Sequence, residues 1–272
     1  MPESRTTVER RHGWPSNGLW VILGLGLTVR LALALTATGT NDVAAFRILA
    51  EMLHSGGRLY LDSLAPAEPY NYPPPWAAIA LAALNLSDHT GLPFIFWLQL
   101  PVIVADCGIA YMLYLMADAR HRRANWAAAM YALNPLPVII ATWHGQFDAI
   151  PTLFTLLAIH VYQRQNPLPW AALCLGLGIA FKPFPVLVVP VFLLYIGRWR
   201  ERIQFCALII VPTLVLLLPF LLQDPGSVVR PIFGYAGFAN HGWAMLLYQV
   251  DGILERRGLA LPVGSFLEPV MN

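Results

Sequence analysis

The stretch Trp143-His144-Gly145-Gln146-Phe147-Asp148 decides how this chain folds and where its chemistry lies. It places an indole N–H, an imidazole, an amide and a carboxylate between two long apolar runs. Polar and ionisable groups at membrane depth are costly, and they usually face a cavity or a partner. Asp42 closes the first apolar run of the chain in the same way. Two polar clusters at the ends of apolar helices therefore predict a site at one face of a membrane protein.

The composition is that of an integral membrane protein. The 272 residues are 57% hydrophobic and 12% charged, whereas a soluble domain carries about 25% charged residues. The three cysteines, Cys107, Cys174 and Cys206, lie in apolar runs without metal-ligand spacing, so we expect no disulfide and no metal site. The sequence contains no phosphate-cradling Gly-Lys-Ser loop, dinucleotide fingerprint, zinc motif or nucleic-acid signal. It predicts neither a cofactor nor a nucleic-acid partner.

The hydropathy pattern predicts an all-α polytopic fold with about seven transmembrane helices. The predicted spans are residues 18–40, 94–117, 124–143, 149–163, 168–181, 184–197 and 204–222. Several are shorter than the roughly 20 residues that a perpendicular helix needs. Short helices are tolerated where protein covers their ends. A further apolar piece, residues 76–86, is too short to be assigned as a span.

The arginines set the predicted orientation, because cytoplasmic loops of membrane proteins are enriched in Arg and Lys. Ten of the sixteen lie in four segments outside the predicted helices: Arg5, Arg10 and Arg11; Arg120, Arg122 and Arg123; Arg164; and Arg198, Arg200 and Arg202. All four segments are cytoplasmic only if residues 76–86 do not cross the membrane. If that piece crossed, the second cluster would be external, so we favour seven spans.

This orientation divides the chain into three parts. Residues 1–17 form a cytoplasmic N-terminal tail. Residues 18–222 form a transmembrane core with a long external loop at 41–93, and residues 223–272 form an extracytoplasmic C-terminal segment. We expect a multi-pass protein of the plasma (inner) membrane with its N-terminus in the cytoplasm.

The external loop has predicted structure of its own. Asn41 and Asp42 are good N-cap residues for a helix over 43–53 that has apolar residues on one face and ends at Gly56-Gly57. Such a helix lies along the membrane surface. In Tyr72-Pro73-Pro74-Pro75, the prolines fix an extended entry and then allow a second helix to start.

The polar residues at the helix ends have structural and functional interpretations. Asp42 caps a helix, acts as a carboxylate base at the membrane surface, or does both. His144, Gln146 and Asp148 could end one helix and cap the next. A bare loop does not need an imidazole, an amide and a carboxylate within five positions, so we favour a functional role for this group.

Four further polar residues have a structural interpretation, a functional one, or both. Lys182 is the only lysine; it suits a phosphate contact as a point charge, and snorkelling to the interface explains it equally well. His241, near Trp243, belongs either to a ligand site or to an interfacial aromatic anchor. Arg30 and Asp106 lie midway along predicted spans, where a structural buried pair is expected.

The order of these motifs resembles that of the membrane-embedded GT-C glycosyltransferases, which use polyprenyl-phosphate sugars. The resembling residues are Asn41-Asp42, Tyr72-Pro73-Pro74-Pro75, and Asn134-Pro135 followed by His144-Gly145-Gln146-Phe147-Asp148. The last of these is similar to the Asn-Pro … His-Phe-Gln-Tyr-Asn pattern of lipid-linked glucosyltransferases. The resemblance covers most of residues 18–243 and is strongest to bacterial and GPI-type mannosyltransferase-like branches.

The resemblance implies a core of seven helices and a catalytic base in the first external loop, which is Asp42 here. It implies inverting transfer of a hexose, with mannose favoured, from a polyprenyl-phosphate donor to a hydroxyl of a glycan or lipid acceptor. The expected substrate-binding residues are Tyr72, His144, Gln146, Asp148, Lys182 and His241. Two features depart from the family pattern. The usual pair of acids is reduced to Asn41-Asp42, and the chain ends soon after the seventh span. It is either a short member of the family, a truncated chain, or a chain whose further helices come from a partner.

Two other functions compete with this one. A transporter would have charged residues near mid-membrane and repeated halves, but only Arg30 and Asp106 fit and no repeat is visible. A non-catalytic subunit of a glycosyltransferase complex is supported by the short C-terminus. Sugar transfer by membranes containing the wild type or Asp42→Asn distinguishes the three functions.

Overall fold

The structure is a computed structural model that describes residues 17–62, 70–117, 122–164 and 167–234. Within these ranges every regular element is helical. The elements are α1 (Asn17–Thr36), α2 (Asn41–His54), α3 (Pro75–Thr90), α4 (Phe94–Met116), α5 (Arg122–Ala132), α6 (Pro135–Ile139), the π-helix η1 (Ile140–His144), α7 (Ala149–Gln163), α8 (Leu168–Phe181), the 3₁₀-helix η2 (Phe184–Val188), α9 (Val189–Tyr195), α10 (Trp199–Leu221) and α11 (Pro225–Phe233).

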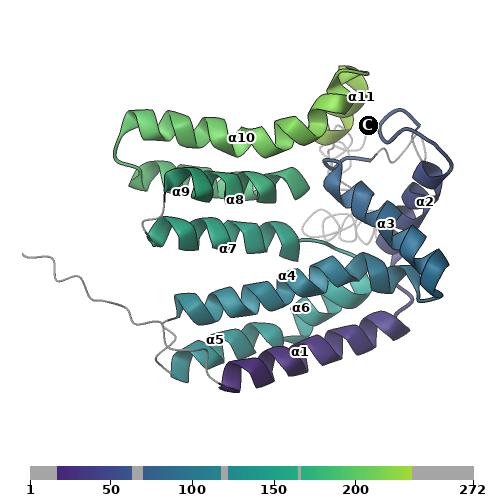
Figure 1. Cartoon of the computed structure of the whole chain (residues 1–272), viewed down its shortest axis with the longest axis horizontal. Helices are drawn as coiled ribbons and strands as arrows, with labels where there is room; N and C mark the ends of the chain where they lie inside the picture. Colours follow the sequence, from purple (N-terminus) through teal and green to yellow (C-terminus); the bar gives the residue numbers. More distant parts are fainter. Residues whose placement is uncertain (1–16, 63–69, 118–121, 165–166, 235–272) are drawn as a thin grey trace, which may run out of the picture.

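Most of these helices run side by side along one axis and form a flat bundle (Figure 1). Helix α8 packs between α7 and α10, α7 packs on α4, and α4 contacts α1 and α5. Helices α2, α3 and α11 gather at one end of this bundle (Figure 1). The rods that run along the axis are α1, α4, α5–α6–η1, α7, α8, η2–α9 and α10, and they correspond to the predicted spans.

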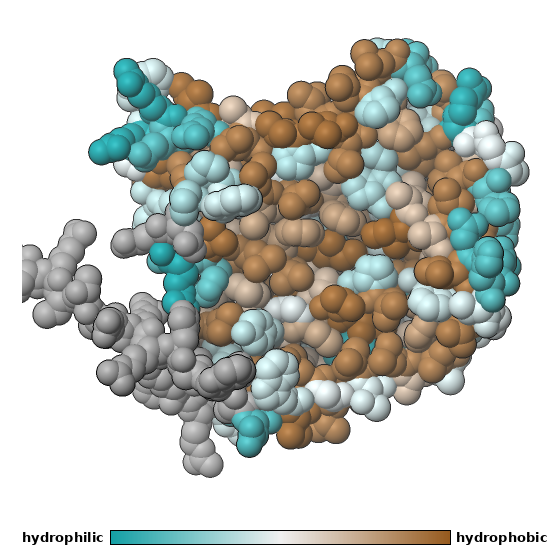
Figure 2. Space-filling model, viewed as in Figure 1, coloured by the Kyte–Doolittle hydropathy of each residue, from teal (hydrophilic) through white to brown (hydrophobic). Residues whose placement is uncertain are grey.

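The chain is an all-α polytopic membrane protein. Helices α1, α4 and α10 are long and apolar enough to cross a membrane, and α7, α8 and η2–α9 are shorter apolar segments. Large apolar side chains point outward from α1, α9 and α10, among them Trp20, Leu25, Leu194 and Val215. Figure 2 shows this apolar surface as a broad band over the bundle, with hydrophilic residues at its two ends. An apolar outer face on helices with partly buried inner faces is expected where lipid is the solvent.

The first loop folds as a cap over one end of the bundle. Residues 76–86 belong to α3, which packs on α2 and α4 and lies across the bundle end with α2 (Figure 1). The predicted start of α2 is wrong in detail. Its N-cap is Thr40, and Asn41 and Asp42 are already helical. No side chain caps this end, which leaves the carboxylate of Asp42 available for other contacts.

The predicted span over 124–143 is present, but it is broken into three helical pieces. Helix α5 ends at Ala132, and α6 begins at Pro135. Pro135 has no N–H to donate to the preceding turn, and Asn134 caps the new helix by accepting a hydrogen bond from the N–H of Leu136 at 2.9 Å. The segment then widens into the π-helix η1 before it reaches His144.

The other helix boundaries agree with the predicted ones to differing degrees. Helices α7 and α8 have the predicted bounds 149–163 and 168–181. The first span ends at Thr36 instead of residue 40, and the last begins at Trp199 instead of 204. The predicted span 184–197 is shorter and begins as the 3₁₀-helix η2. Pro190 lacks the N–H that a continuous α-helix would donate to the carbonyl of Val186, so η2 and α9 remain separate elements.

Candidate active site

A tight turn after η1 meets the first turn of α2 at the capped end of the bundle. Gly145 has φ +90°, a left-handed conformation that side chains rarely adopt. A Cβ at this position would lie 2.5 Å from Cγ2 of Val43. The Thr40 hydroxyl donates to the carbonyl of His144 at 2.5 Å, although the two residues are 104 positions apart. A glycine is therefore needed for the turn to lie against Asp42.

Five side chains form a continuous chain of polar contacts, which we call the polar array: His144, Asp42, Gln146, Lys182 and Asp148. The Gln146 amide donates from Nε2 to Oδ2 of Asp42 at 2.5 Å. Its Oε1 accepts from Lys182 Nζ at 3.1 Å. Lys182 Nζ also forms an ion pair with Oδ1 of Asp148 at 2.6 Å, and Nδ1 of His144 lies 3.5 Å from Oδ2 of Asp42.

The charges on either side orient the amide of Gln146. A carboxylate only accepts hydrogen bonds and an ammonium only donates them, so the NH₂ end must face Asp42 and the carbonyl end Lys182. Asp148 therefore meets a cation, whereas Asp42 meets a neutral donor and an imidazole. Among the described residues, Oδ1 of Asp42 accepts no hydrogen bond. The Asp42 side chain is 40% exposed, so this oxygen can accept a proton from a bound molecule.

Aromatic rings form the base of the array. Phe147 is fully buried and stacks on Trp76 with ring centroids 4.3 Å apart. Tyr72 contacts Phe147 edge to face at 5.2 Å. Lys182 Nζ lies 5.2 Å from the Phe147 ring centroid and 5.6 Å from that of Tyr72, within range of cation–π attraction. The lysine is thus held by the rings of Phe147 and Tyr72 and by its polar contacts with Asp148 and Gln146.

Two buried phenols fix the backbone that carries Tyr72. The hydroxyl of Tyr60 donates to the carbonyl of Tyr72 at 2.8 Å, and that of Tyr70 donates to the carbonyl of Pro73 at 3.0 Å. Burial raises the pKa of both Tyr60 and Tyr70 above the ordinary tyrosine value. Both phenols therefore stay protonated and keep donating.

A pocket of about 310 Å³ opens beside this segment, between the end of α2, the start of α3 and the α10–α11 turn. Leu53, Ala77 and Phe220 provide apolar walls, and Gln223 provides a polar group. Tyr60 lines the pocket while its hydroxyl holds Tyr72. Tyr60 therefore lies between this pocket and Tyr72, which borders the polar array.

The structure brings most of the predicted site residues together. Asp42, His144, Gln146, Asp148 and Lys182 form the array, and Tyr72 borders it. His241 lies outside the described residues. Asp148 occupies the N-cap position of α7, as predicted, but its side chain makes no cap hydrogen bond and binds Lys182 instead. Lys182 is 20% exposed and points into the array, so it does not snorkel outward.

Sequence reasoning missed the parts of the site that depend on close packing. It did not predict the contact of Thr40 with His144 or the roles of Tyr60 and Tyr70. The stacking of Phe147 on Trp76 has a weak signal in the sequence, since Phe147 is the only large apolar residue in the turn at 144–148. Within the described residues, no three His, Cys, Asp or Glu side chains are placed to hold a metal ion.

Residues 70–234, more than half of the chain, match the sequence profile of glycosyltransferase family 87. The chain belongs to glycosyltransferase family 87. The part that matches this family contains Tyr72, the turn at 144–148 and Lys182, whereas Asp42 precedes it. Membership of this family, together with the all-α membrane fold, confirms the resemblance to membrane-embedded glycosyltransferases.

This family 87 protein is also similar to a curated relative named GPI mannosyltransferase 1, from Candida albicans (strain SC5314 / ATCC MYA-2876). The two are 24% identical over 243 residues, which cover 81% of this chain and 54% of the relative. The chain thus spans about half the length of the curated relative that it matches. No solved structure matches the family 87 chain.

Proposed function

We propose that this protein transfers a hexose, with mannose favoured, from a polyprenyl-phosphate donor to an acceptor hydroxyl at the extracytoplasmic face, with inversion at the anomeric carbon. The polar array carries the proposal. It combines a carboxylate with one unpartnered oxygen and a cation held near it, at the capped end of the bundle in a family 87 protein. The name of the Candida albicans relative supports mannose as the sugar.

The arrangement suggests a role for each side chain. Asp42 accepts the proton of the acceptor hydroxyl through Oδ1, while Gln146 holds Oδ2 in place. The acceptor oxygen bonds to the anomeric carbon from one side, and the bond from that carbon to the donor phosphate breaks on the other. The polyprenyl phosphate leaves with the bonding electron pair and needs no proton.

Positive and N–H groups near the departing phosphate stabilise the charge that it gains. Lys182 is the first such group, with His144 beside it in the array and His241 as a further candidate. Asp148 keeps Lys182 close to Gln146 until the donor arrives. Its side chain is 43% exposed, so the phosphate can compete with it for the ammonium.

The distribution of arginines supports the extracytoplasmic side. Arg164, Arg198, Arg200 and Arg202 lie at helix ends far from the array, because α7 and α10 run from one end of the bundle to the other (Figure 1). Under the enrichment of Arg in cytoplasmic loops, the array faces outward. A donor whose sugar has already been flipped across the bilayer would reach it there.

The test is a transfer assay with the purified protein in liposomes that contain polyprenyl-phosphate mannose and a total lipid extract as acceptor. Asp42→Asn should lower the transfer rate by about a hundredfold or more, as expected for loss of a general base. The matched control is Glu51→Gln, which removes an exposed carboxylate from the same helix and should leave transfer unchanged.

Each alternative gives a different result in this assay. Full activity of Asp42→Asn would contradict the role of the base. No transfer from the mannose donor, with transfer when a different polyprenyl-phosphate hexose replaces it, would contradict mannose. A wild-type protein that is inactive until a partner chain is added would favour the non-catalytic or incomplete subunit, and sugar uptake without transfer would favour a transporter.

A further inference from the structure

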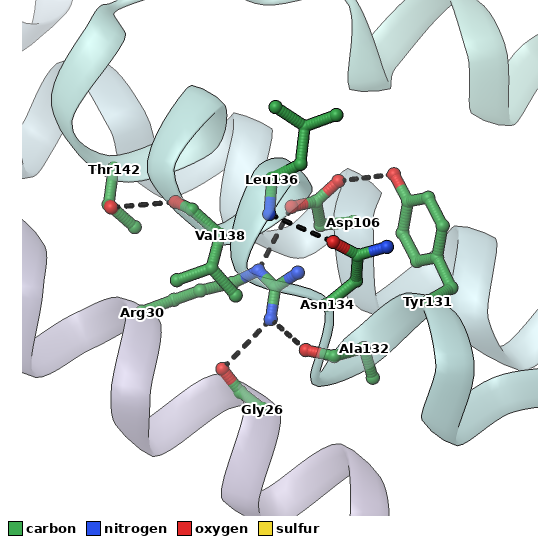
Figure 3. Close-up of polar contacts among 9 residues, drawn as sticks. All are labelled: Gly26, Arg30, Asp106, Tyr131, Ala132, Asn134, Leu136, Val138 and Thr142. Carbon is green, nitrogen blue, oxygen red and sulfur yellow. Dashed lines mark hydrogen bonds and ion pairs between the residues drawn. The ribbon is translucent and has the colours of Figure 1, made fainter.

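A second polar cluster lies inside the bundle, far from solvent. Arg30 of α1 and Asp106 of α4 are 1% and 2% exposed, and Arg30 Nε donates to Asp106 Oδ2 at 2.9 Å. The Tyr131 hydroxyl donates to the other carboxylate oxygen at 2.6 Å. Figure 3 shows these side chains converging from three helices. The buried pair predicted from the sequence is confirmed, with Tyr131 as an additional member.

Arg30 also makes a contact that the pairing of charges does not require. Its Nη1 donates to the carbonyl of Ala132 at 2.6 Å, at the last residue of α5. In an unbroken helix this carbonyl would accept from the N–H of residue 136. The N–H of Leu136 is instead directed to the Asn134 side chain. Arg30 therefore satisfies a carbonyl that the Asn134-Pro135 break leaves open (Figure 3).

The segment that begins at this break ends in the polar array. Residues 135–144 pass through α6 and η1, and Gly145 and Gln146 follow directly. The far end is fixed by Thr40, which holds the carbonyl of His144. Arg30 and Thr40 both belong to the first segment of the chain, in which α1 leads to Asp42. This segment thus fixes both ends of the stretch that carries His144 and presents Asp42 to it.

We infer that Arg30 is a positioning residue for the sugar transfer, and this inference rests on the proposed function. By holding the carbonyl of Ala132, Arg30 fixes the position at which α6 starts. The start of α6 in turn sets the position of His144 and Gln146 relative to Asp42. The planar guanidinium donates to Asp106 and to Ala132 in fixed directions. An ammonium in the same place neutralises Asp106 but lacks this fixed geometry.

The test is Arg30→Lys, measured by hydrogen–deuterium exchange and by steady-state kinetics on the purified full chain. Amides of residues 137–148 should exchange faster, while those of α7 and α8 keep their wild-type protection. The turnover number kcat should fall about tenfold, because Gln146 no longer holds Asp42 in register. The KM for the donor should stay within twofold, because Lys182 follows α8, which the break does not move.

The matched control is Arg47→Lys, which alters an exposed arginine paired with Glu51 and should change neither readout. Unchanged exchange in 137–148 together with unchanged kcat in Arg30→Lys would overturn the inference. Faster exchange confined to 137–148 supports the positioning of this segment even if the wild type transfers no sugar. In that case the proposed function fails alone.

A second variant decides the matter if Arg30→Lys does not fold. Arg30→Met/Asp106→Leu removes both buried charges together, and replacing a buried pair by apolar residues is often neutral for stability. The variant still loses the contact with Ala132. Local loosening of 137–148 in the folded double variant supports the inference, and wild-type protection of that segment would overturn it.

Discussion

In the part of the chain that the structure describes, two ion pairs between an Arg or Lys and a carboxylate join distant segments, and their surroundings give them different consequences. Arg30 and Asp106 are almost fully buried at 2.9 Å, whereas Lys182 and Asp148 pair at 2.6 Å with 20% and 43% of their side chains exposed. Breaking a buried pair leaves a charge that water cannot reach, but breaking an exposed pair does not. The first pair therefore matters for folding, and the second is free to exchange partners with a substrate.

The largest expected effect comes from breaking the buried pair on one side. Asp106→Leu should lower the free energy of unfolding by about 3–5 kcal/mol, because it leaves the charge of Arg30 uncompensated. Thermal unfolding in detergent measures this loss. The double variant Arg30→Met/Asp106→Leu should recover most of it. If Asp106→Leu alone unfolds like the wild type, the comparison between the two pairs is wrong.

The next effect sharpens the comparison inside the polar array. Gln146→Glu puts a carboxylate between Asp42 and Lys182, so Asp42 loses its donor and gains a like charge. We expect kcat to fall on the order of a hundredfold, with the melting temperature close to that of the wild type. Gln146→Met, which removes the donor without adding charge, should lose less activity. An equal loss in both variants would contradict the like-charge explanation.

A smaller effect is expected for the cation of the exposed pair. Lys182→Met keeps most of the apolar stem and removes the charge. Use of the donor should weaken roughly tenfold or more, as for one lost hydrogen bond to a charged group, while the acceptor KM stays nearly constant. Because Asp148 remains half-exposed, stability should change by less than about 1 kcal/mol. Unchanged donor kinetics would leave Lys182 as a structural partner of Asp148.

The smallest effect belongs to a third pair, which lies on the surface of the cap. Arg58 lowers the pKa of Asp62 through hydrogen bonds, and the two side chains are 64% and 40% exposed. The contribution of Asp62 to stability is present above its ordinary pKa and is lost as the pH falls through the lowered value. Asp62→Asn should leave the melting temperature at pH 7 nearly unchanged. A clear drop in melting temperature would show that the exposure of an ion pair does not predict its contribution to stability.

The sequence made the members of the polar array predictable, but not their contacts. Asp42, Asp148 and Lys182 each interrupt a strongly apolar pattern at a helix end, and that interruption is visible without a structure. The bridging by Gln146 depends on the left-handed turn at Gly145 and on the π-helix before it. The turn and the π-helix place Gln146 through tertiary packing, which a hydropathy pattern does not predict.

The fold shows the same division. The bounds of α7 and α8 were predicted because polar residues and prolines mark them on both sides. The break after Ala132 was missed because both halves of the run 124–143 are apolar and only Asn134-Pro135 separates them. The carbonyl contact that stabilises this break comes from Arg30, 102 positions away. A sequence pattern within residues 124–143 therefore cannot predict the contact with Arg30.

The shortness of η2–α9 has a consequence for the surrounding lipid. Leu187 and Leu194 on this segment are 77% and 80% exposed, so acyl chains meet it directly. Twelve residues from Phe184 to Tyr195 rise about 18–20 Å, against a hydrocarbon thickness of about 30 Å. Hydrophobic mismatch of this size thins the bilayer locally. We expect the leaflet to dip beside Lys182, just before this segment, so that the phosphate of the proposed lipid-borne donor would reach the ammonium without leaving the headgroup layer.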